Sequence, residues 1–176
     1  LDGLMARYVA GALPEPARVL VAAHLCLRPE RRLFIDSLEC AAGDALDRTD
    51  PVSLSNRDSR LAAVFNSAPS AAMAKPLPAN GLLPAVLRDF IGFDVDTIPW
   101  KTKMPGYREF SLGEIDGCEA NMLWIKAGRK MPAHTHEGSE LTLVLDGAFR
   151  DANGRYGRGD ISLADENVDH RPIAED

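Results

Sequence analysis

The feature that most constrains this chain is residues 128–147, where two histidines and a glutamate occur close together at fixed spacing. On an extended strand, side chains two residues apart share a face, so His134 and His136 are expected to project together, about 7 Å apart. A small kink after them would turn Glu140 to the same side. Imidazole nitrogens and carboxylate oxygens bind divalent cations, zinc at about 2.0–2.2 Å. We therefore predict a metal site, with His170 as the fourth ligand from a separate stretch of chain.

The same residues can also be interpreted without a metal. A histidine in a strand is most often a structural residue, and two histidines with a glutamate can form a solvated polar face. That interpretation does not require glycine at both fixed ends of the stretch, which Gly128 and Gly147 provide, or a further histidine downstream. The metal site is therefore the favoured prediction.

The spacing resembles the first motif of the cupin family, Gly-x5-His-x-His-x3-Glu-x6-Gly. Its specified positions are filled here by Gly128, His134, His136, Glu140 and Gly147. The resemblance implies a small β-barrel of the jelly-roll type that holds a metal through three histidines and one glutamate.

The second cupin motif, Gly-x5-Pro-x-Gly-x2-His-x3-Asn, is matched only in part. Gly159 and His170 agree with it. The proline, inner-glycine and asparagine positions hold instead Asp165, Asn167 and Ala174. His170 therefore enters the predicted ligand set on a weaker match than His134, His136 and Glu140.

Composition limits the class of protein and its partners. The chain has 176 residues, of which 45% are hydrophobic and 26% charged, and a net charge of −6. An acidic chain argues against direct binding to nucleic acid, and no apolar run reaches the roughly 18 residues of a membrane span. The start is no secretory signal and lacks an initiator methionine, so we expect further residues before Leu1. Three cysteines form no paired framework, which favours a reducing, cytoplasmic setting.

The N-terminal part is rich in alanine and leucine and is predicted to form three short helices. An apolar stripe that ends at Gly11 marks the first helix. Residues 14–16 suit the first turn of a second helix, where proline costs no hydrogen bond. The third is expected at residues 31–46. Such helices bury too little surface to be stable alone, so they need a metal, a partner or another domain.

The predicted fold class is α+β, a small N-terminal helical domain followed by a jelly-roll (cupin) β-barrel. The helical domain is placed at residues 1–46, a linker with short helices (60–66 and 82–91) at 47–92, and the cupin barrel at 93–176. Strands are predicted at residues 97–101, 107–112, 120–127, 141–150 and 160–164, with a hairpin turn at Asn153-Gly154. A cupin barrel normally needs a strand after its second motif. We therefore expect that strand to be missing from this stretch, disordered or replaced.

A second resemblance covers both ends of the chain. Residues 4–16 and 21–24 resemble the anti-sigma domain of the ChrR family of zinc-containing anti-sigma factors. Residues 143–160, with 170–173, resemble the cupin of the same family. That family joins a helical domain to a C-terminal cupin, which is the order predicted here.

The chain departs from the family at its zinc motif, His-x3-Cys-x2-Cys. His24 fills the first position, but the two cysteine positions hold Arg28 and Arg31. A guanidinium group stays cationic and offers no lone pair to zinc. We therefore predict that the helical domain has no zinc site and that His24 caps or packs a helix. The two arginines are expected to form ion pairs, with Glu30, Asp36 or Glu39 as candidate partners.

The first functional hypothesis is a regulatory protein. Its resemblance to ChrR-type anti-sigma factors implies that the N-terminal helices hold a sigma factor. The cupin would sense an oxidant or a small molecule bound in the barrel. A signal can act only through different affinities for two states of the protein.

The second hypothesis is a cupin metalloenzyme, a dioxygenase or a hydrolase acting on a small molecule, with the helices as a remnant or as an arm that forms a homodimer. Three histidines and a glutamate suit a divalent metal, zinc by resemblance, with iron, manganese or nickel as the alternatives. We favour the regulatory hypothesis, for which no catalytic residue is predicted.

Overall fold

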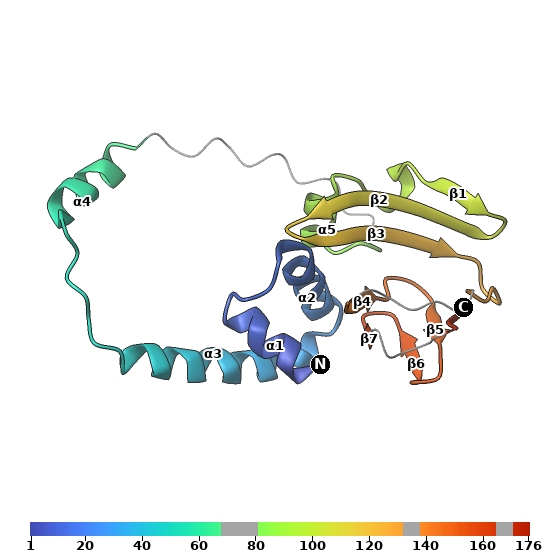
Figure 1. Cartoon of the computed structure of the whole chain (residues 1–176), viewed down its shortest axis with the longest axis horizontal. Helices are drawn as coiled ribbons and strands as arrows, with labels where there is room; N and C mark the ends of the chain where they lie inside the picture. The colour runs from blue at the N-terminus through green and yellow to red at the C-terminus, as the bar shows by residue number, and fades with distance from the viewer. Residues whose placement is uncertain (68–80, 132–137, 165–170) are drawn as a thin grey trace.

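The computed structural model describes residues 1–67, 81–131, 138–164 and 171–176. It combines helices with antiparallel strands, so the α+β class is as predicted (Figure 1). The first helices lie against the strands, while one short helix stands away from this body (Figure 1). No helix in the described part is long and apolar enough to cross a membrane.

The three predicted N-terminal helices are present. They are α1 (Asp2–Val9), α2 (Glu15–Leu27) and α3 (Arg32–Asp47), with a short 3-10 turn, η1 (Pro29–Arg31), before α3. Pro16 lies in the first turn of α2, where its missing N–H removes no helical hydrogen bond. The buried residues of α2 point to more than one side: Ala17, Val19, Val21, Ala23, His24 and Leu25. This helix is therefore enclosed by neighbours.

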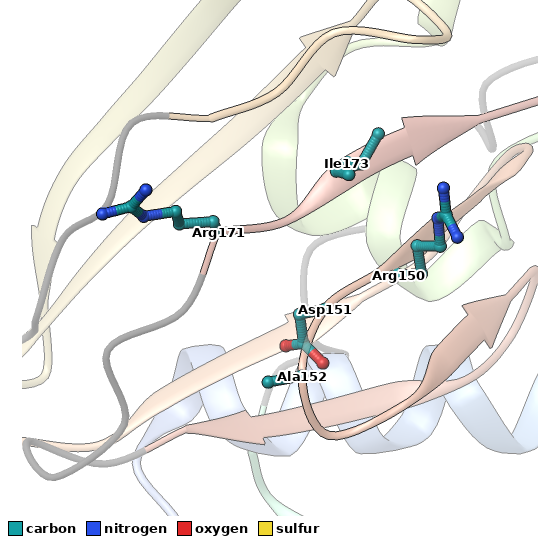
Figure 2. Close-up of a pocket in the computed structure, with 5 residues that line it drawn as sticks. All are labelled: Arg150, Asp151, Ala152, Arg171 and Ile173. Carbon is teal, nitrogen blue, oxygen red and sulfur yellow. The ribbon is translucent and has the colours of Figure 1, made fainter.

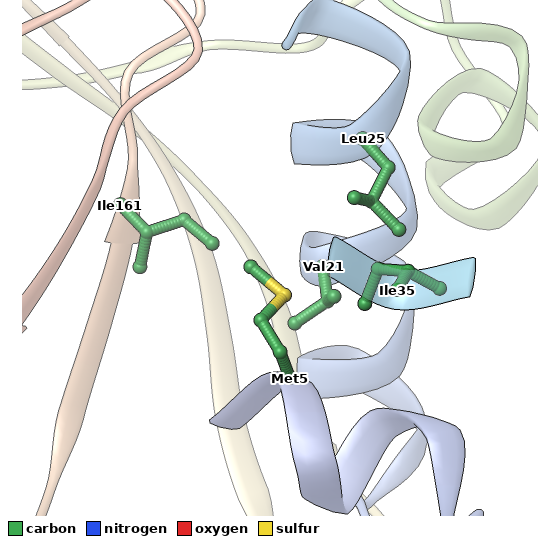
Figure 3. Packing of buried hydrophobic residues seen from close by; sticks show 5 residues of the cluster. All are labelled: Met5, Val21, Leu25, Ile35 and Ile161. Atoms are coloured by element: carbon green, nitrogen blue, oxygen red, sulfur yellow. The ribbon is translucent and has the colours of Figure 1, made fainter. Parts of the chain in front are cut away.

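The core of the helices includes a residue from the strands. Met5, Val21, Leu25 and Ile35 come from α1, α2 and α3, and Ile161 comes from strand β7 (Ile161–Ala164). Figure 3 shows the side chains of Met5 and Ile161 directed toward one another across the boundary between helices and strands. The helices alone are too small to bury much apolar surface, and packing against the strands increases the surface that they bury.

After α3 the chain leaves this core. Helix α4 (Arg57–Phe65) matches the short helix predicted near residues 60–66, and Figure 1 shows it apart from the other described elements. The next helix, α5 (Ala85–Ile91), ends at Gly92. Its Ile91 and the flanking residues Leu83 and Ile98 form one core that side chains of the strands join. Phe93 meets Phe110 of strand β2 (Tyr107–Ile115) edge-to-face at 5.5 Å between ring centroids.

The strands form three antiparallel sheets, with orders β1-β2-β3, β4-β7 and β6-β5-β8. Besides β7, their bounds are β1 (Lys101–Met104), β2 (Tyr107–Ile115), β3 (Cys118–Ile125), β4 (Glu140–Leu143), β5 (Ala148–Arg150), β6 (Arg155–Gly157) and β8 (Ile173–Glu175). The strands predicted at 107–112, 120–127 and 160–164 and the turn at Asn153-Gly154 are confirmed. Among the described strands the sheets do not close into a barrel, so the jelly-roll part of the prediction is not established by these contacts.

Two details of the strand prediction are wrong. Of residues 97–101, Thr97 ends a 3-10 turn, η2 (Val95–Thr97), residues 98–100 form neither helix nor strand, and only Lys101 lies in a strand. The Asp94 side chain accepts a hydrogen bond from the Val95 amide and so caps η2. The strand predicted at 141–150 is two strands, because the chain turns between β4 and β5. Strand β8 pairs with β5, but it overlaps the last position of the second motif, Ala174, and does not follow the motif, so the expectation about a strand after that motif stays a prediction.

Candidate functional site

Of the four predicted metal ligands, the structure describes Glu140. This residue begins β4, opposite Ala164 at the end of β7, and is partly buried. Thr142 Oγ1 donates a hydrogen bond to Glu140 Oε1 at 3.2 Å. His134, His136 and His170 lie outside the described residues. Among the residues that are described, no group of three or more His, Cys, Asp or Glu could hold a metal ion.

The described residues that flank the histidine-bearing segments are paired at both ends. On one side, the Met131 amide donates to the Pro172 carbonyl at 2.9 Å, and Lys130 forms an antiparallel bridge with Ile173. On the other side, Glu140 pairs with Ala164. The described residues just before and just after these two segments are therefore paired with each other: 130–131 with 172–173, and 140 with 164. A carboxylate on such a frame is the donor type that a divalent metal accepts.

The position that ends the first motif requires glycine for steric reasons. Gly147 has φ +62°, and a Cβ placed on it would lie 2.8 Å from the Glu175 carbonyl oxygen. At the other end of the motif, the Gly128 amide donates to the Ala174 carbonyl at 2.8 Å. Both motif glycines thus lie against the C-terminal strand β8. The sequence pattern marked these glycines, but their role in seating this strand was not predicted.

A shallow hollow lies beside β8 and is not a convincing ligand site (Figure 2). It measures about 470 Å³ and is lined by Arg150, Asp151, Ala152, Arg171 and Ile173. The two guanidinium groups point away from one another in Figure 2. That of Arg150 is already paired with Glu175 at 3.0 Å, and Glu140 does not line the hollow.

The position of the family zinc motif is occupied by a contact between α2 and the strands. His24 is buried, and its Nδ1 lies 2.6 Å from the Gly159 carbonyl oxygen. Because a carbonyl can only accept, Nδ1 carries the proton. Arg28 Nη2 lies 2.8 Å from Asp160 Oδ1, and Arg28 Nη1 lies 4.0 Å from Glu30. We call His24, Arg28, Gly159 and Asp160 the α2–β7 cluster.

The predicted ion pairs of the arginines are therefore only partly correct. Glu30 is a distant partner of Arg28, whereas the close partner, Asp160, was not predicted because it lies 132 residues away in the sequence. The other two candidate partners, Asp36 and Glu39, pair instead with Arg32, at 3.0 and 3.6 Å. His24 packs against the strands, as the packing prediction required.

A long segment of the chain, residues 39–67, is exposed to solvent, and we call it the arm. Every residue in it is exposed, although it contains the end of α3 and all of α4. Its large apolar side chains are Leu46, Val52, Leu54, Leu61, Val64 and Phe65. Val52 is 91% exposed and Phe65 79%. Large apolar side chains that face solvent along one segment indicate a surface for a protein partner.

Comparisons with known proteins give three similarities. Residues 89–176 match the family described as the ChrR Cupin-like domain. The anti-sigma-E factor ChrR of Cereibacter sphaeroides is 38% identical over 177 residues, which cover 99% of this chain and 82% of that protein. The solved structure of Rhodobacter sphaeroides SigE in complex with the anti-sigma ChrR matches with a TM-score of 0.82 and 38% identity, over 99% of this chain and 90% of the solved one.

Proposed function

Because this chain belongs to the ChrR family of anti-sigma factors, with a cupin-like domain at its C-terminus, we propose that it holds a sigma factor through its N-terminal helices and its arm. The cupin-like domain responds to an oxidant or a small molecule and changes that affinity. A regulator of this kind needs two states that bind the sigma factor differently. The sigma factor bound by the ChrR relative in the solved complex supports this choice of partner.

The observation that carries the proposal is the exposed arm. Leu61, Val64 and Phe65 lie at i, i+3 and i+4 on α4, so they share one face of that helix. A helix of nine residues is marginal in water without tertiary contacts. The match to the solved complex covers 99% of this chain, so it includes the arm. We infer that the sigma factor covers the α4 face.

Sigma-factor binding by α4 variants tests this function. Each purified sigma factor of the source organism would be titrated against the full chain by calorimetry. We expect one of them to bind, and Leu61→Asp with Phe65→Asp to weaken binding at least 30-fold, since loss of an interface hot spot costs about 2 kcal/mol or more. These residues are exposed, so the thermal unfolding midpoint should change little.

The control is Ala63→Asp, which adds one negative charge, where the double variant adds two, on the side of α4 opposite Leu61, Val64 and Phe65. It should bind within about threefold of the unmodified chain, because it leaves the apolar face intact. Equal losses for the control and the double variant would refute docking through this face. Failure of every sigma factor to bind would refute the function itself.

We further propose that His134, His136, Glu140 and His170 bind one divalent metal inside a jelly-roll barrel. Zinc is the first choice, and iron, manganese or nickel are the alternatives. The paired backbone on both sides of residues 132–137 and 165–170 supports a shared site, as does the match to the cupin-like family. Zinc in such a site would act as a structural or Lewis-acid centre, and Glu140 would serve as a ligand.

A further inference from the structure

Helix α2 is held by the strand region at both of its ends. At its N-terminus, the Glu15 amide donates to Asp116 Oδ2 in the β2–β3 turn at 2.8 Å. A carboxylate there also complements the positive end of the helix dipole. At its C-terminus, His24 and Arg28 contact Gly159 and Asp160 of the α2–β7 cluster. Between these ends, Val21 and Leu25 share a core with Ile161.

In the α2–β7 cluster the side chains are in close contact, and the Asp160 carboxylate is held in position by a hydrogen bond of its own. Asp160 Oδ2 accepts a hydrogen bond from the Gly157 amide at 2.8 Å, which fixes this carboxylate before it meets Arg28. A Cβ on Gly159 would lie 3.0 Å from Arg28 Cγ, so the arginine stem lies directly on the glycine. Among the described residues nothing hydrogen-bonds to the buried Nε2 of His24. The imidazole is therefore held by Gly159 and by its packing.

The cluster is continuous with the strand pair that carries Glu140. The Val144 carbonyl accepts a hydrogen bond from the Gly159 amide at 2.7 Å, and the Val144 amide donates one to the Asp160 carbonyl at 3.0 Å. From there β4 and β7 pair without interruption as far as Glu140 and Ala164. Glu140 lies four residues from Val144 on the same chain, about 13 Å along a strand. One antiparallel ladder thus joins the predicted ligand to the cluster.

From this arrangement we propose that the α2–β7 cluster couples the cupin-like domain to the sigma-binding helices without a metal in the helices. Arg28 stands where the family motif has its first cysteine, and it binds Asp160 of the cupin-like domain instead of zinc. A change at the Glu140 end of the ladder shifts β7, and Gly159 and Asp160 pass that shift to α2. The regulatory meaning of this coupling rests on the proposed function.

Hydrogen–deuterium exchange on the full chain tests the coupling without any sigma factor. The variant Arg28→Gln removes the guanidinium from a pair 2.8 Å long that joins α2 to the strands. Its matched control, Arg155→Gln, breaks a pair of the same length, with Glu175, inside the strand region. We expect the α2 amides to exchange about fivefold faster in Arg28→Gln than in the control. Arg28→Lys keeps the charge and should recover part of the protection.

Chelation then tests whether the cluster transmits the state of the cupin-like domain. Treatment with EDTA should speed exchange at both β7 and α2 in the unmodified chain and in Arg155→Gln. In Arg28→Gln the EDTA effect should be confined to β7.

Two results would overturn the coupling: equal α2 exchange in Arg28→Gln and Arg155→Gln, or an α2 response to EDTA that survives in Arg28→Gln. Sigma-factor binding is measured separately by calorimetry. Its failure would remove the proposed function, while the exchange data would still decide whether the cluster couples the two parts.

Discussion

At the scale of single residues, Gly159 gives a sharp test of the close contact between α2 and β7. Its φ is +88°, and an added Cβ would lie 3.0 Å from Arg28 and from Leu27. We expect Gly159→Ala to lower the free energy of unfolding by about 2–4 kcal/mol, from backbone strain and overpacking together. Urea denaturation monitored by circular dichroism measures this loss.

The control for that substitution is Gly113→Ala. Gly113 has a similar φ of +82°, but nothing lies within 4 Å of an added Cβ. The backbone strain alone should cost about 1–2 kcal/mol. If both alanine variants lost the same free energy of unfolding, overpacking of Gly159 against Arg28 would add nothing to the cost of the substitution.

Residue-level prediction from the sequence worked where a local pattern carries the information. The spacing of the first motif singled out Gly147, and the replacement of cysteine by Arg28 predicted an ion pair. The ligand role of Glu140 stays a prediction. The sequence could not identify Asp160 as the partner, because 132 residues separate the pair and only the fold joins them. For the same reason, the contact of His24 with Gly159 had no sequence signal.

At the scale of elements, the N-terminus of α2 is capped from another part of the chain. Its own N-cap residue is Pro14, which makes no side-chain cap, and Asp116 supplies the acceptor. We expect Asp116→Gly to destabilise the chain by about 1 kcal/mol, since lost caps cost about 0.5–2 kcal/mol. Glycine tolerates the positive φ of 50° at this position, so the loss would report the cap. Thermal unfolding measures the change.

The variant Asp116→Asn serves as the control. Asparagine also accepts positive φ and keeps a side-chain oxygen for the Glu15 amide, so it should lose only the charge–dipole part, about 0.3–1 kcal/mol. A glycine variant as stable as the asparagine variant would show that the hydrogen bond from Asp116 does not support α2.

Element prediction was reliable for helices and long strands and weak for short strands. The apolar periodicity of α1, α2 and α3 is local, and so are proline and glycine signals at their ends. The three-residue strand β8 is set by its pairing with β5, which no local pattern reveals. The exposure of α4 was not predicted either, because the spacing of its apolar residues is the same as that of a helix face packed in a core.

At the scale of the whole molecule, contacts with the strands help to stabilise the small helical part. Ile161, Asp116 and the α2–β7 cluster supply α2 with apolar, capping and ionic contacts from the strands. The division at residues 1–46, 47–92 and 93–176 stays a prediction. The matched cupin-like region begins at residue 89, within α5, and α5 packs on the strands. The helices therefore depend on the strand region, while the arm stays exposed for a partner.

Metal stoichiometry of the full chain tests this arrangement as a whole. We expect one divalent metal per chain, bound in the cupin-like domain, because arginine cannot replace the thiolates of the helical motif. Glu140→Ala and His134→Ala should each lose most of the metal, since removing a ligand or its support weakens binding 10-fold or more. His24→Ala should keep the full equivalent. Elemental analysis of dialysed protein measures the ratio.

Removal of the metal should also lower the thermal unfolding midpoint, because a ligand that binds the folded chain stabilises it by mass action. EDTA should therefore destabilise the unmodified chain and His24→Ala by similar amounts, and Glu140→Ala by much less. Two metals per chain, or one that disappears in His24→Ala, would place zinc in the helices after all. The contact of Arg28 with Asp160 could then not be the substitute for that zinc, and the coupling of helices to strands would need another origin.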